Sequence, residues 1–234
     1  RARRQLGERL EQAVTTELEG LEMKGARLVV ALEPLDEAGP TGLERVALEL
    51  VSHPGAPALP LGKGASGGEL SRIMLALEVV LADAADAPRA AADAATNADP
   101  AGAPDRTGPA EHQRTFVFDE IDAGVGGRAA REIGRRLARL ARRHQVVVVT
   151  HLAQVAAWAH TQLVVIKETP RTTASDCAAS DAAAQTARTR VVRVAGAERV
   201  TELARMLSGH ENSRAALRHA TELLDEARVA QSPT

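Results

Sequence analysis

The chain has 234 residues and a net charge of −2, so it is long enough to bury a core and lacks the basic footprint of a general nucleic-acid binder. Two Phe, one Trp and no Tyr leave few platforms on which single-stranded bases could stack, which argues against a binder that works by aromatic stacking. The single cysteine, Cys177, excludes an internal disulfide and a multi-cysteine zinc site. No apolar run approaches the ~20 residues that span a bilayer, and no signal-peptide pattern opens the chain.

The first 23 residues carry an apolar stripe at three- and four-residue spacing, made of Leu6, Leu10, Val14, Leu18 and Leu21. This spacing predicts a helix, which is either the base of a coiled coil or an ordinary amphipathic helix, and three heptads do not distinguish the two. The chain begins with RARRQL and no Met, so we expect a piece of a longer protein.

Two strand-like runs follow, ARLVVALEPL and LERVALELVS, and the turn-rich DEAGPTG between them predicts a hairpin. After a loop, apolar residues recur at helical spacing over 69–82 and predict a helix. Residues 83–114 are mostly Ala, Asp, Pro and Gly with almost no large apolar side chain, so we expect a disordered insertion. Residues 169–189 have a similar composition and predict a second insertion.

Between the two insertions, apolar strands alternate with helices. The runs TFVF, QVVVVT and QLVVIK predict strands, and 128–143 and 152–160 predict the helices between them. Fully apolar strands between helices predict an α/β fold with a mostly parallel sheet covered on both faces. Two further helices, AERVTELARMLSG and SRAALRHATELLDEARVA, are predicted after the second insertion, with a break at Ser208 and Gly209.

A glycine-rich turn, LGKGASGGELSR, opens the helix predicted over 69–82. It is not a Walker A loop, because the residue after Lys63 is glycine where that motif needs Ser or Thr, and no other stretch matches. Ser66 and Glu69 form a capping box. Gly67 and Gly68 leave bare N–H groups at the positive end of the helix, where an anion can bind. The alternative is a plain capped helix.

Polar residues follow two of the predicted strands at their C-terminal ends, where ligands bind in open α/β sheets. Asp119 can hold Mg²⁺ there, and the neighbouring Glu120 can polarise a water for attack on a γ-phosphate. His151 follows the next strand, after Thr150 as a helix N-cap, and can sense a terminal phosphate. The alternatives are an acidic loop and a structural histidine.

The helix predicted over 128–143 carries seven arginines against one glutamate, with Arg135, Arg139 and Arg142 among them. Such a patch can neutralise DNA phosphates in a salt-dependent way. The alternative is a solvated helix face.

Taken together, ASGGELSR, FVFDEIDAGVGG and VVVTHLAQVAAWA resemble the signature, the Walker B with D-loop, and the switch-histidine segments of ATP-binding-cassette ATPases. The residues of these motifs most resemble those of the branch that is related to the structural-maintenance-of-chromosomes (SMC) proteins and acts in bacterial DNA repair and recombination. The segment RVTELARMLSGHENSRAALRHATELL resembles the end of the same family. The resemblance implies the C-terminal lobe of an ATPase head over 24–234, with 1–23 as the end of a coiled-coil arm.

The resemblance also implies roles for the matching residues of the Walker B, D-loop and switch segments. Asp119 would be the Mg²⁺ ligand, and Glu120 and His151 would be catalytic. Ala123 and Gly124 would belong to the D-loop.

The signature residues would contact the γ-phosphate of an ATP molecule bound to the opposite head. They are Ser66, Gly67, Gly68 and Glu69. Gly126 stands where the D-loop of related ATPases commonly ends in Asp.

For the intact protein, the resemblance implies an ATPase that uses ATP and Mg²⁺, works as a homodimer of heads and acts on DNA ends or double-strand breaks. The N-terminal half of the same protein would supply Walker A, so the 234 residues alone are expected to be inactive. No membrane is implied, and the expected location is the cytoplasm, on the nucleoid. Two alternatives are the nucleotide-binding domain of a transporter and a non-catalytic partner that lends only its signature.

Overall fold

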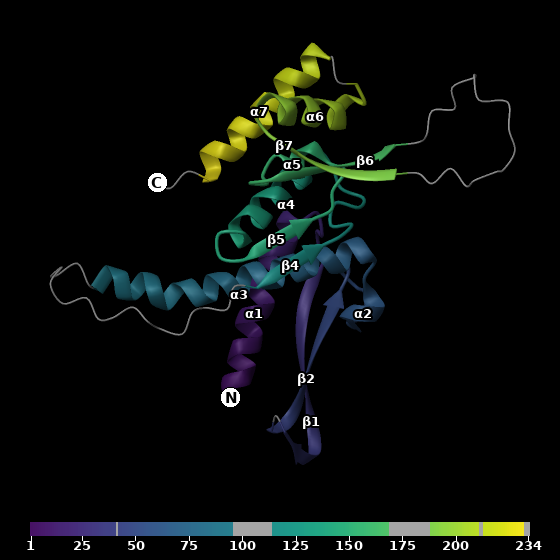
Figure 1. Ribbon diagram of the computed structural model, residues 1–234. Coiled ribbons are helices and arrows are strands. Elements are labelled where there is room, and N and C mark those ends of the chain that lie inside the picture. The colour runs from purple at the N-terminus through teal and green to yellow at the C-terminus, as the bar shows by residue number, and fades with distance from the viewer. Residues whose placement is uncertain (41, 96–113, 169–187, 211–212, 232–234) are drawn as a thin grey trace, which may run out of the picture.

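The computed structural model describes residues 1–40, 42–95, 114–168, 188–210 and 213–231. None of the helices in these ranges combines the length and the hydropathy of a bilayer span. The elements in chain order are α1 (Ala2–Gly20), β1 (Arg27–Gly39), β2 (Gly42–Val51), β3 (Leu59–Pro60), α2 (Leu61–Gly64), α3 (Gly67–Ala95), β4 (Thr115–Phe118), α4 (Gly127–Leu140), β5 (Gln145–Val148), α5 (Ala153–Ala156), β6 (Gln162–Glu168), β7 (Arg188–Val194), α6 (Gly196–Ser208) and α7 (Arg214–Gln231) (Figure 1).

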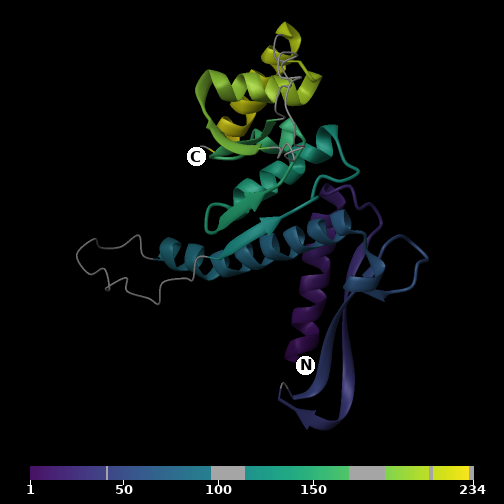
Figure 2. The same ribbon diagram turned by 45° about the vertical axis from the view of Figure 1, so that its right-hand side comes forward.

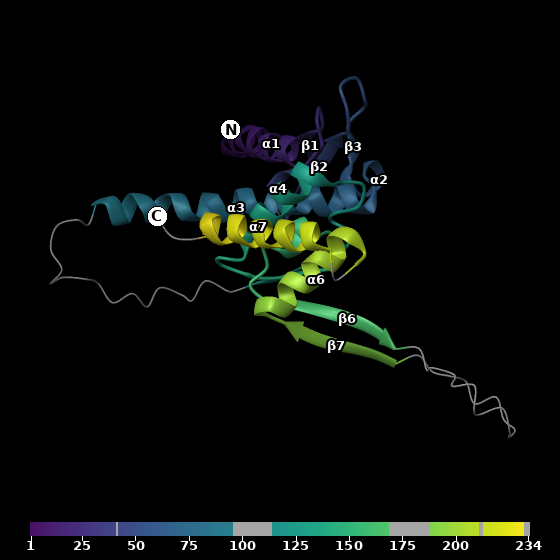
Figure 3. The ribbon, with the colours of Figure 1, turned by 90° about the horizontal axis from the view of Figure 1, so that it is seen from above.

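The strands confirm the α/β class and form three small sheets. Strands β4 and β5 pair in parallel, while β1–β2–β3 and β6–β7 pair antiparallel. The predicted mostly parallel sheet is therefore limited to one pair among the described strands, because the predicted strand QLVVIK pairs with β7 and not with β5. The predicted hairpin is β1–β2, and the predicted pair of later helices is α6 and α7, which a left-handed Gly209 separates. Seen from above, the β6–β7 hairpin projects beyond α6 (Figure 3).

Helix α1 and the β1–β2 hairpin lie side by side at the lower end of the molecule (Figures 1 and 2). Two side chains of α1 cap N–H groups of β1. The carboxylate of Glu11 accepts the N–H of Val30 at 2.6 Å, and the hydroxyl of Thr15 accepts the N–H of Leu28 at 3.3 Å. Unpaired N–H groups at the edge of a sheet can pair with a strand of another chain. These two bonds therefore attach α1 to the hairpin and also occupy edge N–H groups of β1.

The apolar stripe of α1 faces the core of the molecule. Val14, Leu18 and Leu21 are fully buried and Leu10 packs against them, whereas Leu6 is 61% exposed. Within the described residues, α1 is therefore an amphipathic helix packed on the domain. A coiled-coil arm over 1–23 stays a prediction. Leu6 is the one residue of the stripe that is exposed among the described residues, where a partner helix could pack.

Most large apolar side chains gather in one core between α1, the β1–β2 hairpin, α3, β4 and α4. A smaller second core lies between α5, α6 and α7, at the end of the molecule opposite the β1–β2 hairpin (Figure 1). The fully buried members of the first core include Leu18, Leu28, Leu50, Ile73, Leu75, Ile121, Ile133 and Leu140.

Helix α3 is longer than its apolar periodicity predicts. It continues past Ala82, the predicted end, as far as Ala95. The first part of the predicted insertion 83–114 is therefore helical, since alanine, its commonest residue, has the highest helix propensity. Residues 96–113 lie outside the described residues, as do residues 169–187 of the second predicted insertion, whose last two residues begin β7.

The β4–β5 pair differs from the prediction of a sheet covered on both faces. Phe118 is buried against the core, whereas Val117, Val147 and Val149 are 68%, 45% and 59% exposed. Because successive residues of a strand point to opposite faces, the described residues cover one face of this pair and leave the other open.

Candidate functional site

The turn that opens α3 is a capping box, as predicted. The carboxylate of Glu69 accepts the N–H of Ser66 at 2.8 Å, and the hydroxyl of Ser66 accepts the N–H of Glu69 at 3.4 Å. Hydrogen bonds from Ser66 to this carboxylate, that of the backbone N–H foremost, lower the pKa of Glu69 because they favour its ionised form. The first N–H groups of a helix have no partner within the helix, and that of the exposed Gly67 is one of them.

Gly68 is buried, because the turn packs directly against the segment that follows β4. A Cβ atom at Gly68 would lie 3.0 Å from the Cβ of Ala123 and 3.1 Å from the carbonyl oxygen of Glu120. A Cβ atom at Gly67 would lie 3.5 Å from Oε2 of Glu120. The absence of a side chain at Gly68 therefore also allows two segments to meet, whereas the prediction that both glycines bare their N–H groups for an anion stays a prediction.

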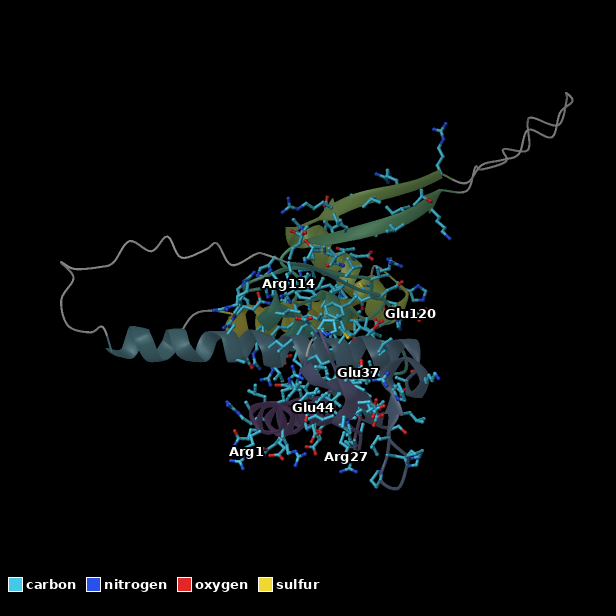
Figure 4. The ribbon with its side chains drawn as sticks, turned by 90° about the horizontal axis from the view of Figure 1, so that it is seen from below. Arg1, Arg27, Glu37, Glu44, Arg114 and Glu120 are labelled. Carbon is cyan, nitrogen blue, oxygen red and sulfur yellow. The ribbon has the colours of Figure 1, made fainter. Side chains whose placement is uncertain are left out.

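The parallel pairing of β4 and β5 brings the residues after both strands to one edge. Asp119 and Glu120 are exposed directly after β4, and His151 is exposed shortly after β5. Figure 4 labels Glu120 close to the end of α3 at which that helix begins, in agreement with the contacts of the glycine turn. The three predicted groups, at 66–69, 119–124 and 151, therefore belong to one region.

Asp122 joins the loops after β4 and β5, although no sequence pattern singled it out. It is 2% exposed, and its Oδ2 accepts the hydroxyl of Thr150 at 2.5 Å and the N–H of His151 at 3.1 Å. The Nδ1 of His151 lies 3.2 Å from the same oxygen, so Asp122 orients the imidazole. Thr150 is not the N-cap of α5, which is Leu152. Its hydroxyl bridges Asp122 and the N–H of Leu152.

The loop after β4 is a tight turn with an unusual backbone at Glu120. The N–H of Ala123 donates to the carbonyl of Glu120 at 3.0 Å, and the N–H of Val125 donates to that of Asp122 at 3.3 Å. Glu120 has φ +56 and Gly124 has φ +73. A left-handed conformation is ordinary for glycine and uncommon for Glu, so the surroundings must hold Glu120 in place. Ala123 and Gly124 are exposed beside it.

The three arginines predicted to contact DNA differ in how free they are. Arg135 pairs with Glu132 at 3.2 Å, and Arg139 pairs with Asp83. Arg142 is exposed near them. A DNA phosphate would have to displace a carboxylate from Arg135 and from Arg139, which reduces what each could contribute to binding.

No protein-family model matches the chain. Over 240 residues it is 45% identical to the DNA repair protein RecN of Streptomyces coelicolor, with 97% of this chain and 35% of that protein covered. The chain is a RecN homologue. The RecN proteins of Mycobacterium tuberculosis H37Rv and Deinococcus radiodurans match it at 43% and 40% identity, over 96% and 95% of this chain and 35% and 32% of those proteins. This chain thus spans about a third of the length of the curated relatives that it matches.

Among solved structures, the Smc head domain of Pyrococcus furiosus with an extended coiled coil, bound to the C-terminal domain of ScpA, is similar with a TM-score of 0.44. The identity is 17%, over 94% of this chain and 38% of that chain. The Smc head domain of Pyrococcus yayanosii with a coiled coil and joint also has a TM-score of 0.44, at 18% identity over 94% of this chain and 29% of that chain. These likenesses are loose, and the homology to RecN rests on sequence.

Proposed function

We propose that this chain is the C-terminal lobe of the ATPase head of a RecN-type protein, which hydrolyses ATP between two heads during recombinational repair of DNA double-strand breaks. Homology to RecN supports the repair role. The observation that carries the ATPase role is the direct packing of the Ser66–Glu69 turn on Glu120 and Ala123, because it joins a phosphate-binding type of turn to paired carboxylates. We expect the protein in the cytoplasm, on the nucleoid.

Asp119 would hold Mg²⁺ in this site. Within the described parts of the chain there is no group of three or more His, Cys, Asp or Glu side chains that could bind a metal ion. The exposed carboxylate of Asp119 directly after β4 suits Mg²⁺, which binds in nucleotide sites through one or two carboxylates and completes its shell with phosphate oxygens and water. When bound, Mg²⁺ would neutralise charge on the phosphates of ATP.

Glu120 would act as the general base that orients the attacking water and accepts its proton. Its carboxylate is exposed at the edge of the sheet and lies toward Gly67, so substrate and water can reach it. His151, held by Asp122, would hydrogen-bond a terminal phosphate from the neighbouring loop. The barrier would fall through positioning and charge stabilisation, without a covalent intermediate.

The turn of Ser66, Gly67, Gly68 and Glu69 would contact the γ-phosphate of ATP bound to the opposite head. The capping box fixes the turn and occupies the N–H of Glu69, and the N–H of the exposed Gly67 would bind the incoming anion at the positive end of α3. Binding of this kind in trans makes the site a product of dimerisation. Ala123 and Gly124, exposed beside the turn, would line the same interface.

The remainder of the protein would complete the head and supply its Walker A loop. Strand β5 and the start of β6 border a cavity of about 470 Å³, with Trp158 on its wall. The face of β4–β5 that carries Val117 and Val147 is also open. An apolar strand edge and face of this kind support the packing of a further segment of the same protein against them.

Binding of DNA ends by this lobe would begin at Arg142, with Arg135 and Arg139 joining once their ion pairs open. The alternative of a transporter domain gains no support from the relatives named above, which are DNA repair proteins. The alternative of a non-catalytic partner is tested by activity. The 234-residue segment alone should show negligible ATP turnover, and the full-length protein should turn over ATP.

In the full-length protein, Glu120→Gln should lower kcat for ATP by about 100- to 10,000-fold, because the amide cannot accept the proton of the attacking water. ATP binding should persist, and dimers with trapped ATP should accumulate in gel filtration. Glu222→Gln, which removes an exposed carboxylate on α7, is the matched control and should leave kcat unchanged. Turnover at the wild-type rate in Glu120→Gln would show that another group is the base.

A further inference from the structure

Two side chains directly after the capping-box turn reach across to the backbone around Glu120. The hydroxyl of Ser71 donates to the carbonyl of Asp119 at 3.0 Å. The guanidinium of Arg72 donates from Nη1 to the carbonyl of Ala123 at 3.0 Å and to that of Ile121 at 3.5 Å. One turn of α3 therefore holds carbonyls on both sides of Glu120.

These bonds surround a backbone position that is strained. Apart from Glu22, Glu120 is the only residue other than glycine with positive φ in the described part of the chain. A residue persists in this region when the surrounding structure holds it there, and such residues cluster at functional sites. The conformation of Glu120 also sets where its carboxylate points, which is toward Gly67.

Arg72 is an unusual residue for its place on α3. It is 7% exposed, and its Nε has no hydrogen-bond partner among the described residues. A guanidinium is rarely buried unless its donors are used, so packing alone does not account for it. Gly68 keeps the passage open, because a Cβ atom there would lie 3.4 Å from Nη1 of Arg72 and 3.1 Å from the carbonyl oxygen of Glu120.

We propose that Arg72, assisted by Ser71, is a positioning residue that holds the Asp119–Ala123 segment on α3 and thereby aims the carboxylate of Glu120. The inference rests on the proposed role of Glu120 as the base. Arg72 does not touch ATP in this arrangement. Its loss would misplace the base without removing any group that binds the nucleotide, and a small misplacement of a catalytic group is costly to the rate.

The test uses the full-length protein with Arg72→Met, which keeps an apolar stem and removes the donors. We expect kcat for ATP to fall by about 10- to 100-fold while KM changes by less than about threefold. Arg72→Lys, which keeps a charged donor, should restore part of the loss. The matched control is Arg199→Met, since Arg199 also donates to backbone carbonyls, those of Ala156, Ala157 and Ala159, and, among the described residues, to none in the Asp119–Ala123 segment. It should keep kcat per folded molecule.

The outcomes separate this inference from the proposed function. The proposed function fails if the wild-type protein does not turn over ATP, or if Glu120→Gln leaves its turnover unchanged. If turnover depends on Glu120 and Arg72→Met keeps the wild-type kcat, or loses only as much as Arg199→Met, the positioning role is wrong. Should Arg72→Met not fold, Ser71→Ala removes a single bond to the same segment. A fall in kcat of about threefold at unchanged KM would then support the inference, and an unchanged kcat would overturn it.

Discussion

The two apolar cores of the chain differ in what fills them. In the core around α3, the fully buried side chains are mainly leucine and isoleucine, such as Leu18, Ile73 and Leu140. In the core between α5, α6 and α7, six alanines accompany two leucines, Leu203 and Leu223. An alanine buries far less apolar area than a leucine, so the second core gains less hydrophobic free energy per buried residue.

Hydrogen bonds from one arginine compensate in the second core. Arg199 on α6 donates to the carbonyls of Ala156, Ala157 and Ala159 at 3.0, 3.2 and 2.7 Å, and to the side chain of Gln162 at 3.2 Å. Burial lowers the pKa of Arg199, a sign of the desolvation that these bonds must offset. We infer that the first core depends on side-chain volume, and the second depends on a few polar bonds.

The largest effect should come from volume lost in the first core. Leu18→Ala leaves a cavity beneath α1 and should lower the free energy of unfolding by about 2–5 kcal/mol, measured by denaturant titration. Leu6→Ala on the same helix changes a side chain that is 61% exposed and should stay within about 0.5 kcal/mol of wild type. If Leu18→Ala lowered the free energy of unfolding as little as Leu6→Ala, α1 would contribute nothing to the core.

A smaller and more local effect should follow from Arg199→Met. Leaving three carbonyls without their donor should cost about 1–3 kcal/mol, and the loss should be confined to α5, α6 and α7. Hydrogen exchange measured segment by segment should show faster exchange there and unchanged protection in α3 and α4. Arg218→Met, at an exposed site on α7, is the control. Protection lost equally in both regions would show that they unfold as one unit, and would break the comparison.

The parts of the molecule that could be predicted are those whose signal is local. Ser66 and Glu69 bond to each other across three residues, and the hairpin and the helices follow periodicities within one element. Buried polar links could not be predicted, because their partners are distant in sequence. Asp122 lies 28 residues from Thr150, and Arg72 lies 51 residues from Ala123. No spacing rule relates such pairs, and only the parallel pairing of strands and the packing of α3 bring them together.

The alanine-rich end of α3 shows a different limit. Its composition lacks the apolar side chains that would bury it, which favours disorder, while its alanines favour helix. The preceding turns of α3 pack in the first core through residues such as Ile73 and Val79, so the nucleus of the helix already exists and its extension adds one residue at a time. Periodicity predicts the part of a helix that carries recurring large apolar residues, and here the helix continues beyond the last of them.

The smallest expected effect concerns the capping box at the start of α3. It is a polar feature beside the first core, whose stability should depend mainly on the volume of its apolar side chains. The hydrogen bonds from Ser66 lower the pKa of Glu69 from its ordinary 4.5, so ionised Glu69 stabilises the fold above pH 4.5, and this contribution is lost as the pH falls below 4.5 toward the lower pKa of the folded state. Glu69→Gln keeps an acceptor but loses the charge. It should cost about 0.5 kcal/mol at neutral pH and less near about pH 3, measured by denaturant titration at both values. Glu37→Gln, an exposed site on β1, should show no difference at either pH. If Glu69→Gln costs the same at both pH values, the effect comes from the shape of the side chain and not from its charge. If it costs as much as Leu18→Ala, polar bonds support the first core as much as they support the second core.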